Sequence, residues 1–261
     1  MGTYAAPRHV AAATGALAAA EIRALKGVRR LAMLTAYDYP TALALDAAGL
    51  DLILVGDSLG EVELGYPSTR WVTLDMMRHH VRAVRNGVSR THLVADMPAS
   101  TYRDPDEAVA SAKALMEAGA DSVKLEGALV PQVEAIIAAG IPVMGHVGLL
   151  PQTAEERRRH GKTADEAEAI AMDAAALDAT GCYAVVIEAV VPGLATRITP
   201  LVGCPTIGIA AGNDCDGQVL VSTDLLGLLP DPPPFVRPKV DLAGVIREVA
   251  REFATEVRDG A

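Results

Sequence analysis

The sequence predicts an α/β fold, a (β/α)8 TIM barrel, from three observations. Eight short apolar runs recur along the 261 residues, and each run ends in a polar or glycine-containing tail. Stretches of helical spacing separate most of these runs. No Pro/Ser-rich linker interrupts the middle of the chain, and single-domain barrels commonly have this length. We therefore expect one barrel domain over residues 1–261, with an extra N-terminal helix or arm over residues 1–24.

The apolar runs are the expected strands. In chain order they read LAMLTAYD, LDLILVGDS, HLVADMP, DSVKLEG, IPVMGHVG, YAVVIEA, CPTIGIAAG and GQVLVSTD. The chain is 51% hydrophobic but only 3% aromatic, so its core must be built mainly from Ala, Val, Leu and Ile. Such a core suits strands that are buried on both faces and covered closely by helices.

Helical patterns lie between the strands. DPDEAVASAKALMEAGA has acidic residues in its first turn, and VPQVEAIIAAG and TADEAEAIAMDAAALDATG share with it a glycine near the end, where a helix C-cap is expected. Over residues 225–261 the pattern becomes irregular. There we expect a Pro-rich segment that wraps the barrel, followed by a closing helix, DLAGVIREVAREFATEVRDG.

Composition excludes several classes of partner. A formal net charge of -10 argues against nucleic acid, because nucleic-acid binding needs a clustered basic surface. The two basic clusters, RHHVRAVRNGVSR and EERRRHGK, fit solvated helix faces or loops. No apolar run is long enough to span a membrane. Cys182, Cys204 and Cys215 show no CxxC spacing, which favours a reducing compartment and predicts a cytoplasmic location.

Polar side chains collect where the strands end. The carboxyl ends of barrel strands form one rim, so residues that follow different strands share a cavity there. The rim residues are Asp57 and Ser58 after the second strand, Asp96 after the third, Lys124 and Glu126 after the fourth, His146 in the fifth and Glu188 in the sixth.

Each of these residues alone has a structural explanation, such as a helix cap, a turn or a hydrogen-bonded core histidine. Together, four carboxylates on one rim repel one another unless a cation or protons neutralise them. Oxygen-only ligands favour a hard ion such as Mg²⁺ over zinc. A 2-oxo acid has two adjacent oxygens that could chelate this ion, which would polarise its carbonyl group.

Two weaker signals leave alternatives open. The segment GIAAGNDCDG is glycine-rich between the seventh and eighth strands, a region where barrels often bind phosphate, but it contains no P-loop or dinucleotide motif. Tyr37 and Asp38 end the first strand, and Asp38 fits a helix cap as well as a catalytic role.

Five segments in order resemble the ketopantoate hydroxymethyltransferase family of pantothenate biosynthesis. They are MLTAYDYPTALALDAAGLDLILVGDSLG, ADMPASTY, VKLEG, GHVGLLPQ and IGIAAGNDCDGQVLV, and the similarity covers roughly Glu21 to Asp224. The pair VGDSLG and GHVGLLPQ is specific to few other families. The resemblance implies a Mg²⁺-dependent barrel that transfers a one-carbon unit from 5,10-methylenetetrahydrofolate to α-ketoisovalerate. It also implies a homo-oligomer, a decamer in this family.

The resemblance also implies roles for the rim residues. It implies a general base at Glu188 and metal contact by Asp57, Asp96 and Glu126. The residues that it implies for binding the 2-oxo acid are Asp57, Ser58, Asp96, Lys124 and His146.

The match departs from the family pattern in three places. TAEERRRHGKTADEAEA replaces a Gly-Gly-aromatic segment and a Val-Gln-Gly-Arg run after Gln152; Ala99 stands where a bulky residue such as Phe is common; and the chain ends in EVRDGA rather than His-Ser-Phe. An alternative function is therefore a divergent Mg²⁺-dependent aldol-type enzyme with a different 2-oxo acid or one-carbon or aldehyde donor. 

Two other classes of protein share part of this pattern. The phosphoenolpyruvate mutase and isocitrate lyase group uses similar chemistry, but the cysteine loop of the lyases is not found near GHVGLLPQ. A non-catalytic binding protein would have no reason to keep buried carboxylates that destabilise it.

Overall fold

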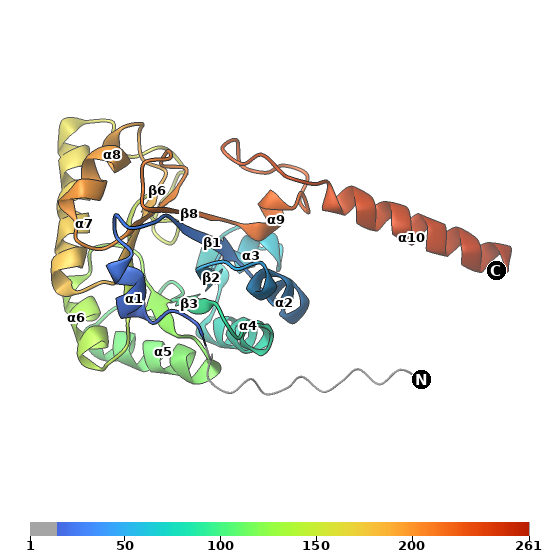
Figure 1. Cartoon of the computed structure of the whole chain (residues 1–261), viewed down its shortest axis with the longest axis horizontal. Coiled ribbons are helices and arrows are strands. Elements are labelled where there is room, and N and C mark those ends of the chain that lie inside the picture. The colour runs from blue at the N-terminus through green and yellow to red at the C-terminus, as the bar shows by residue number, and fades with distance from the viewer. Residues whose placement is uncertain (1–14, 261) are drawn as a thin grey trace. The chain divides into compact units, whose positions relative to one another are not determined.

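The structure, a computed structural model, describes residues 15–260. Its central feature is a closed eight-stranded barrel in the order β1 to β8 (Figure 1). The strands are β1 (Leu31–Thr35), β2 (Leu52–Val55), β3 (His92–Asp96), β4 (Ser122–Lys124), β5 (Val143–Gly148), β6 (Ala184–Glu188), β7 (Thr206–Ile209) and β8 (Gly217–Leu220). All eight predicted strands are confirmed, and with them the (β/α)8 TIM-barrel fold.

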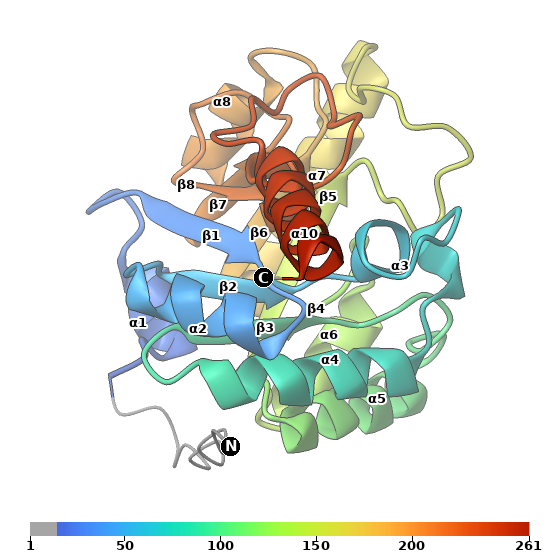
Figure 2. The ribbon, with the colours of Figure 1, turned by 90° about the vertical axis from the view of Figure 1, so that its right-hand side faces the viewer.

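Strands β1 to β8 each pair in parallel with the next strand in the chain. Closure brings the last strand to the first, where the Leu31 N–H donates to the Asp216 carbonyl at 2.9 Å. All strands therefore end on the same side of the barrel. Figure 2 shows them inside a ring of helices that includes α4, α5 and α6.

The helices alternate with the strands over most of the chain. They are α1 (Ala19–Ala24), α2 (Tyr39–Ala47), α3 (Leu59–Val62), α4 (Leu74–Gly87), α5 (Pro105–Ala118), α6 (Val130–Ala138), α7 (Ala164–Thr180), α8 (Leu194–Ile198), α9 (Ser222–Leu225) and α10 (Leu242–Asp259), with short 3-10 helices at Thr69–Trp71 and Thr199–Leu201. The alternation is interrupted between β7 and β8, where the fully described connection contains no helix.

Local chemistry explains where the predicted helices begin and end. Asp104 caps α5 by accepting a hydrogen bond from the Glu107 N–H at 2.9 Å. Gly119 and Gly181 follow α5 and α7 with φ of 116° and 106°, the left-handed backbone that glycine adopts without steric cost. The predicted glycine caps of α5 and α7 are therefore confirmed.

Two apolar clusters hold the barrel together, and strand alternation separates them. Leu52 and Leu54 of β2 belong to the cluster inside the barrel. Ile53 and Val55 of the same strand belong to the larger cluster that packs against the surrounding helices. Because successive strand residues face opposite sides, strands such as β2 and β3 are buried on both faces, as their continuous apolar runs predict. In β1, Ala32 is exposed.

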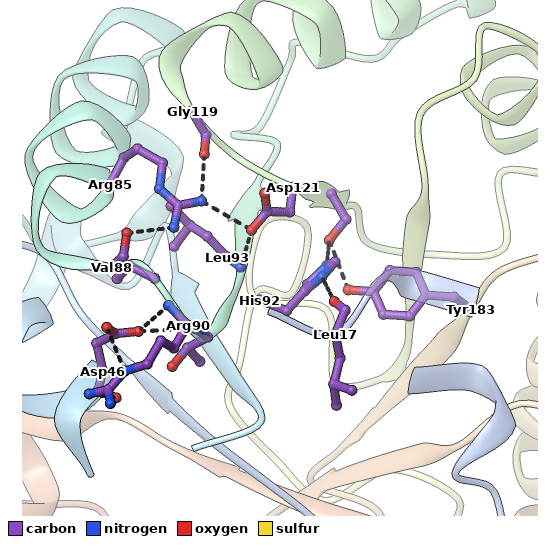
Figure 3. A network of polar contacts seen from close by, with 12 residues as sticks. Leu17, Asp46, Arg85, Val88, Arg90, His92, Leu93, Gly119, Asp121 and Tyr183 are labelled. Carbon is purple, nitrogen blue, oxygen red and sulfur yellow. Dashed lines mark hydrogen bonds and ion pairs between the residues drawn. The ribbon is translucent and has the colours of Figure 1, made fainter. Parts of the chain in front are cut away.

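The predicted extra N-terminal helix is α1, and its side chain Ile22 belongs to the inner cluster. Near it, at the amino ends of the strands, a polar network includes His92 of β3 (Figure 3). His92 Nδ1 lies 2.8 Å from the Leu17 carbonyl, and its Nε2 lies 2.9 Å from the Ser122 hydroxyl. The Tyr183 hydroxyl lies 2.8 Å from the Ser122 hydroxyl and extends this network of polar contacts. These contacts fasten the segment before α1 to the barrel.

Internal contacts divide the chain into two compact units, one up to Val219 and one from Leu220 onward. The second unit contains α9, a Pro-rich segment and α10, so a helix is present where the closing helix is expected. That the Pro-rich segment wraps the barrel and that α10 closes it both stay predictions. Its Lys239 N–H donates to the Leu225 carbonyl at 2.8 Å. The single domain predicted over residues 1–261 stays a prediction. Residues 1–14 of the predicted arm lie outside the described residues.

Two further findings bear on the expectations drawn from composition. Cys182, Cys204 and Cys215 are all buried and unpaired. In the part of the chain that the structure describes, no helix has the length and apolar character needed to cross a membrane.

Candidate active site

The predicted site residues lie at the carboxyl ends of the strands, where strand alternation directs them into the mouth of the barrel. Val94 and Met144 belong to the inner apolar cluster. Asp96 and His146 stand two positions further along β3 and β5, so their side chains face the same way. Glu188 ends β6 in the same manner. The inner core therefore changes from apolar to ionisable as the strands reach the rim.

Lys124 is the cation of this rim. Its ammonium forms an ion pair with Asp96, its partner in the β3–β4 register. The second oxygen of Asp96 accepts a hydrogen bond from the Asp57 N–H at 3.1 Å. Burial by itself would lower the pKa of Lys124, but the charges of Asp96, Asp57 and Glu126 outweigh burial and raise it. Lys124 is therefore charged and is surrounded by carboxylates.

At two of these carboxyl groups the protein disfavours the charged form. Burial raises the pKa of Asp57 to about 7, and the charge of Asp96 adds to the shift. Burial likewise raises the pKa of Glu126 to about 9, with the charge of Asp57 adding to it. One lysine does not neutralise three buried acids, so the cluster favours a further positive charge.

The donor set of Asp57, Asp96 and Glu126 fits a hard divalent cation, because all of its atoms are carboxylate oxygens. Within residues 15–260, no three acidic, histidine or cysteine side chains already form a metal-binding group. Mg²⁺ is commonly held by only one or two carboxylates, with water and substrate oxygens as the other ligands. The residues thus fit Mg²⁺, and their assignment as metal ligands stays a prediction.

His146 lies between two glutamates. Its Nε2 is 3.2 Å from Glu188 Oε2, and its Nδ1 is 3.8 Å from Glu126 Oε1. Burial lowers the pKa of His146, although the contact with Glu188 opposes this shift. The side chain of Glu188 is 22% exposed, whereas that of Glu126 is 3% exposed. Glu188 is thus an acid of the rim that a substrate can reach.

Ser58 follows β2 and faces the first strand. Its hydroxyl lies 2.9 Å from the hydroxyl of Tyr37, which is buried at the end of β1. The neighbouring Asp38 accepts a hydrogen bond from the Thr41 N–H at 2.8 Å and so caps α2. Of the two interpretations left open for Asp38, the structure supports the helix cap.

The sequence interpretation missed two residues of the site. Gln152 donates from its side chain to Asp57 Oδ2 at 2.8 Å and from its backbone to Glu126 Oε2 at 3.0 Å. Tyr102 donates its hydroxyl to the Gln152 side chain. Both residues end motifs used for the resemblance, GHVGLLPQ and ADMPASTY, but neither follows a strand directly. A search for polar residues at the ends of strands therefore does not find Gln152 or Tyr102.

The charged loop after β5 reaches both sides of the rim. Arg157 pairs with Glu61 of α3 at 2.5 Å. Arg159 donates to the carbonyls of Val190, after β6, and Ala210, after β7, at 2.8 and 2.9 Å. The arginine-rich segment that departs from the expected family pattern thus contacts segments that follow β2, β6 and β7.

Comparison with known proteins decides the family. Residues 17–261 match the family model described as ketopantoate hydroxymethyltransferase. The chain belongs to the ketopantoate hydroxymethyltransferase family. It is 50% identical to a 3-methyl-2-oxobutanoate hydroxymethyltransferase of Oleidesulfovibrio alaskensis over 95% of this chain and 89% of the relative. It is 47% identical to the protein of that name from Thermus thermophilus, over 92% of this chain and 94% of the relative.

Solved structures with low sequence identity support the fold. A phosphonopyruvate hydrolase matches with a TM-score of 0.65 and 14% identity, over 94% of this chain and 89% of the other. A 2,3-dimethylmalate lyase of the PEP mutase/isocitrate lyase superfamily matches with a TM-score of 0.62 and 16% identity, over 94% of this chain and 89% of the other. The family thus shares its barrel with the group that the sequence interpretation treated as a rival.

Proposed function

We propose that this protein transfers a hydroxymethyl unit from 5,10-methylenetetrahydrofolate to C3 of 3-methyl-2-oxobutanoate (α-ketoisovalerate), giving ketopantoate. Family membership and the names of relatives about half identical in sequence support this reaction. The observation that carries it is the position of Glu188, which is partly exposed and contacts His146, on the same rim as the buried acids and the ion pair of Lys124 with Asp96. This arrangement suits removal of a proton beside a carbonyl group.

In the proposed reaction, Glu188 removes the proton from C3 of the 2-oxo acid, and His146 holds the Glu188 carboxylate by the contact at 3.2 Å. Lys124 contributes positive charge beside the carboxylate and keto oxygens of the substrate, and the hydroxyl of Ser58 provides a polar contact. A carbon–carbon bond then forms between C3 and the folate-borne methylene. Both carbon–nitrogen bonds of the methylene bridge to folate break, and water supplies the hydroxyl group. The C3 proton and one proton of water end on the two folate nitrogens as tetrahydrofolate leaves.

Mg²⁺ is the proposed cofactor, with Asp57, Asp96 and Glu126 as the residues that would hold it. When bound, it supplies positive charge that favours enolate formation from the 2-oxo acid. The raised pKa values of Asp57 and Glu126 support a cation at this cluster, since a positive charge there would lower both.

The test separates proton removal from transfer. Protein with Mg²⁺ and 3-methyl-2-oxobutanoate in deuterated water should lose the C3 proton signal in proton NMR, and added methylenetetrahydrofolate should give ketopantoate. Glu188→Gln should slow both by about 10² to 10⁴-fold, because the general base is lost. Glu168→Gln, an exposed residue of α7, is the control. Normal exchange in Glu188→Gln would remove Glu188 from its proposed role.

The alternative is a divergent enzyme of this family with another 2-oxo acid or another aldehyde or one-carbon donor. The charged loop after β5 supports this alternative, because it departs from the expected family segment and its Arg159 contacts the segments after β6 and β7. Rates with a series of 2-oxo acids, each with methylenetetrahydrofolate or formaldehyde, distinguish the two. Inert 3-methyl-2-oxobutanoate beside a reactive analogue would favour the alternative.

We propose that the protein is a homo-oligomer, with the decamer of the family as the expected form. Support comes from α10, whose residues are all described and none of which is buried. Val249, Phe253 and Val257 recur at helical spacing on one side of it and are 58%, 66% and 60% exposed. A second copy of the chain is the partner that would cover this apolar side.

The cytoplasmic location expected from the sequence is likewise a proposal. Its support is the state of Cys182, Cys204 and Cys215, which are unpaired and buried, as is usual in a reducing compartment. Fractionation of cells that express the protein, followed by detection with an antibody, tests it.

A further inference from the structure

Gln152 joins two acids of the proposed metal cluster. It lies in the loop after β5 and is only 6% exposed. Its backbone N–H donates to Glu126 Oε2 at 3.0 Å, and its side-chain Nε2 donates to Asp57 Oδ2 at 2.8 Å. The same Nε2 donates to the Met97 carbonyl at 2.9 Å, and Oε1 accepts from the Tyr102 hydroxyl. Both the nitrogen and the oxygen of the side-chain amide are therefore hydrogen-bonded.

The partners fix which way the amide points. Nitrogen of a glutamine amide only donates and oxygen only accepts. The carboxylate of Asp57 and the carbonyl of Met97 are both acceptors, so they require the NH₂ group. The hydroxyl of Tyr102 donates to the oxygen and opposes a flip of the amide. Gln152 is thus oriented by three partners and in turn orients Asp57.

The backbone around Gln152 is held from the other side of the rim. Arg70, in the segment between α3 and α4, donates its Nε to the Gln152 carbonyl at 2.9 Å. The guanidinium also donates to the Ala154 carbonyl. Because main-chain and side-chain groups are both anchored, Gln152 occupies one position relative to Asp57 and Glu126.

We propose that Gln152 is a positioning residue that holds Asp57 and Glu126 in the geometry needed to bind a divalent cation. This inference rests on the metal site of the proposed function. Two buried carboxylates that repel each other would rotate apart without a fixed partner, and a hydrogen bond to one oxygen leaves the other oxygen for the cation. Groups that orient metal ligands typically affect metal affinity by about 10- to 100-fold.

The experiment measures cation binding without catalysis. Mn²⁺ binding to the full-length protein is followed by electron paramagnetic resonance of the free ion, and Mg²⁺ is added as a competitor. Gln152→Ala should weaken Mn²⁺ binding about 10- to 100-fold. Gln152→Met keeps most of the size of the side chain but removes the amide that donates to Asp57, so we expect a similar loss.

Two further variants test the mechanism. Tyr102→Phe keeps the NH₂ donor but releases the amide oxygen, and should weaken binding less than Gln152→Ala does. Gln132→Ala is the matched control, because Gln132 donates to the carbonyls of Tyr102 and Arg103 and touches no acid of the cluster. Its Mn²⁺ affinity should equal that of the unsubstituted protein. The spectrum of the bound ion should also change in the Gln152 variants, which loss of packing alone would not cause.

The outcomes separate this inference from the function on which it rests. Unaltered Mn²⁺ affinity in both Gln152 variants would overturn the positioning role and leave the proposed function in place. If the unsubstituted protein bound no Mn²⁺, the proposed metal site and the role of Gln152 would both be wrong. If Gln152→Ala fails to fold, Gln152→Met and Tyr102→Phe decide the question, since both preserve most of the side-chain volume.

Discussion

Asp57 and Asp46 are both buried aspartates, but their surroundings shift their pKa values in opposite directions. Asp57 lies beside Asp96 and Glu126, and its pKa is raised to about 7, first by burial and then by the charge of Asp96. Burial also acts on Asp46, but hydrogen bonds from the backbone of Arg90 and from other neighbours outweigh it and lower its pKa. The fold thus stabilises the charge of one aspartate and opposes that of the other.

The same substitution should therefore have opposite effects at these positions. Without added metal at pH 8, Asp57→Asn should raise the free energy of unfolding by on the order of 1 kcal/mol, because it removes one of the mutually repelling charges. Asp46→Asn should lower it by about 1–2 kcal/mol, because charged hydrogen bonds are lost. Urea unfolding followed by circular dichroism measures both. Equal destabilisation by the two changes would contradict the account of the cluster.

His92, at the other end of the barrel, should give the protein a pH-dependent stability. Burial lowers its pKa below the ordinary value of 6.5, and Arg85 acts in the same direction, while Asp121 and the Leu17 carbonyl oppose them. The unfolded chain then binds more protons than the folded one as the pH falls. The stability that depends on neutral His92 is complete above pH ~6.5 and is lost progressively below it.

The raised pKa values of Asp57 and Glu126 act in the opposite direction, so the test is a difference between variants. Below about pH 6.5, the slope of the free energy of unfolding against pH should be less positive in His92→Gln than in the unsubstituted protein. His79→Gln, at an exposed position of α4, is the control and should leave the slope unchanged. Thermal or urea unfolding in steps of pH measures the effect. An identical slope in His92→Gln and the unsubstituted protein would show that His92 does not contribute.

At the scale of elements, the boundaries of α5 follow from local hydrogen bonds, and this can be tested. Asp104 accepts from the Glu107 N–H, whereas Asp106 contributes only charge to the first turn. Asp104→Ala should cost about 1 kcal/mol of stability, because a cap is lost. Asp106→Ala, the matched control, should cost only a few tenths. The free energy of urea unfolding distinguishes them, and equal costs would mean that charge rather than capping stabilises the start of α5.

Not every element could be derived from its own residues. The continuous apolar run of β2 predicts a strand, because burial on both faces requires it. The path of the loop after β5 is different, since it depends on Arg157 meeting Glu61 and on Arg159 meeting Val190 and Ala210. These partners are far away in the sequence. A charged run predicts exposure but does not say what it will pair with.

At the scale of the whole molecule, the apolar side of α10 predicts association. Phe253→Glu places a charge in the middle of that side and should shift the protein from its assembled mass towards the monomer, measured by light scattering after size-exclusion chromatography. Arg251→Glu changes charge on the opposite side of the same helix and serves as the control. A purely monomeric unsubstituted protein, or a Phe253→Glu variant of unchanged mass, would argue against assembly through α10.

The sequence by itself determined the barrel and most of its rim. The end of a strand can be predicted from local sequence, and the ends of eight barrel strands share one cavity. This reasoning could assign to that cavity Asp57, Asp96, Lys124, His146 and Glu188. Only the tertiary structure decided which of these residues touch: that Lys124 pairs with Asp96, that Glu188 is the more open glutamate, and that Gln152 bridges two acids. The reason is physical. Periodicity and burial are encoded along the chain, whereas partners are set by how distant strands and loops meet in space.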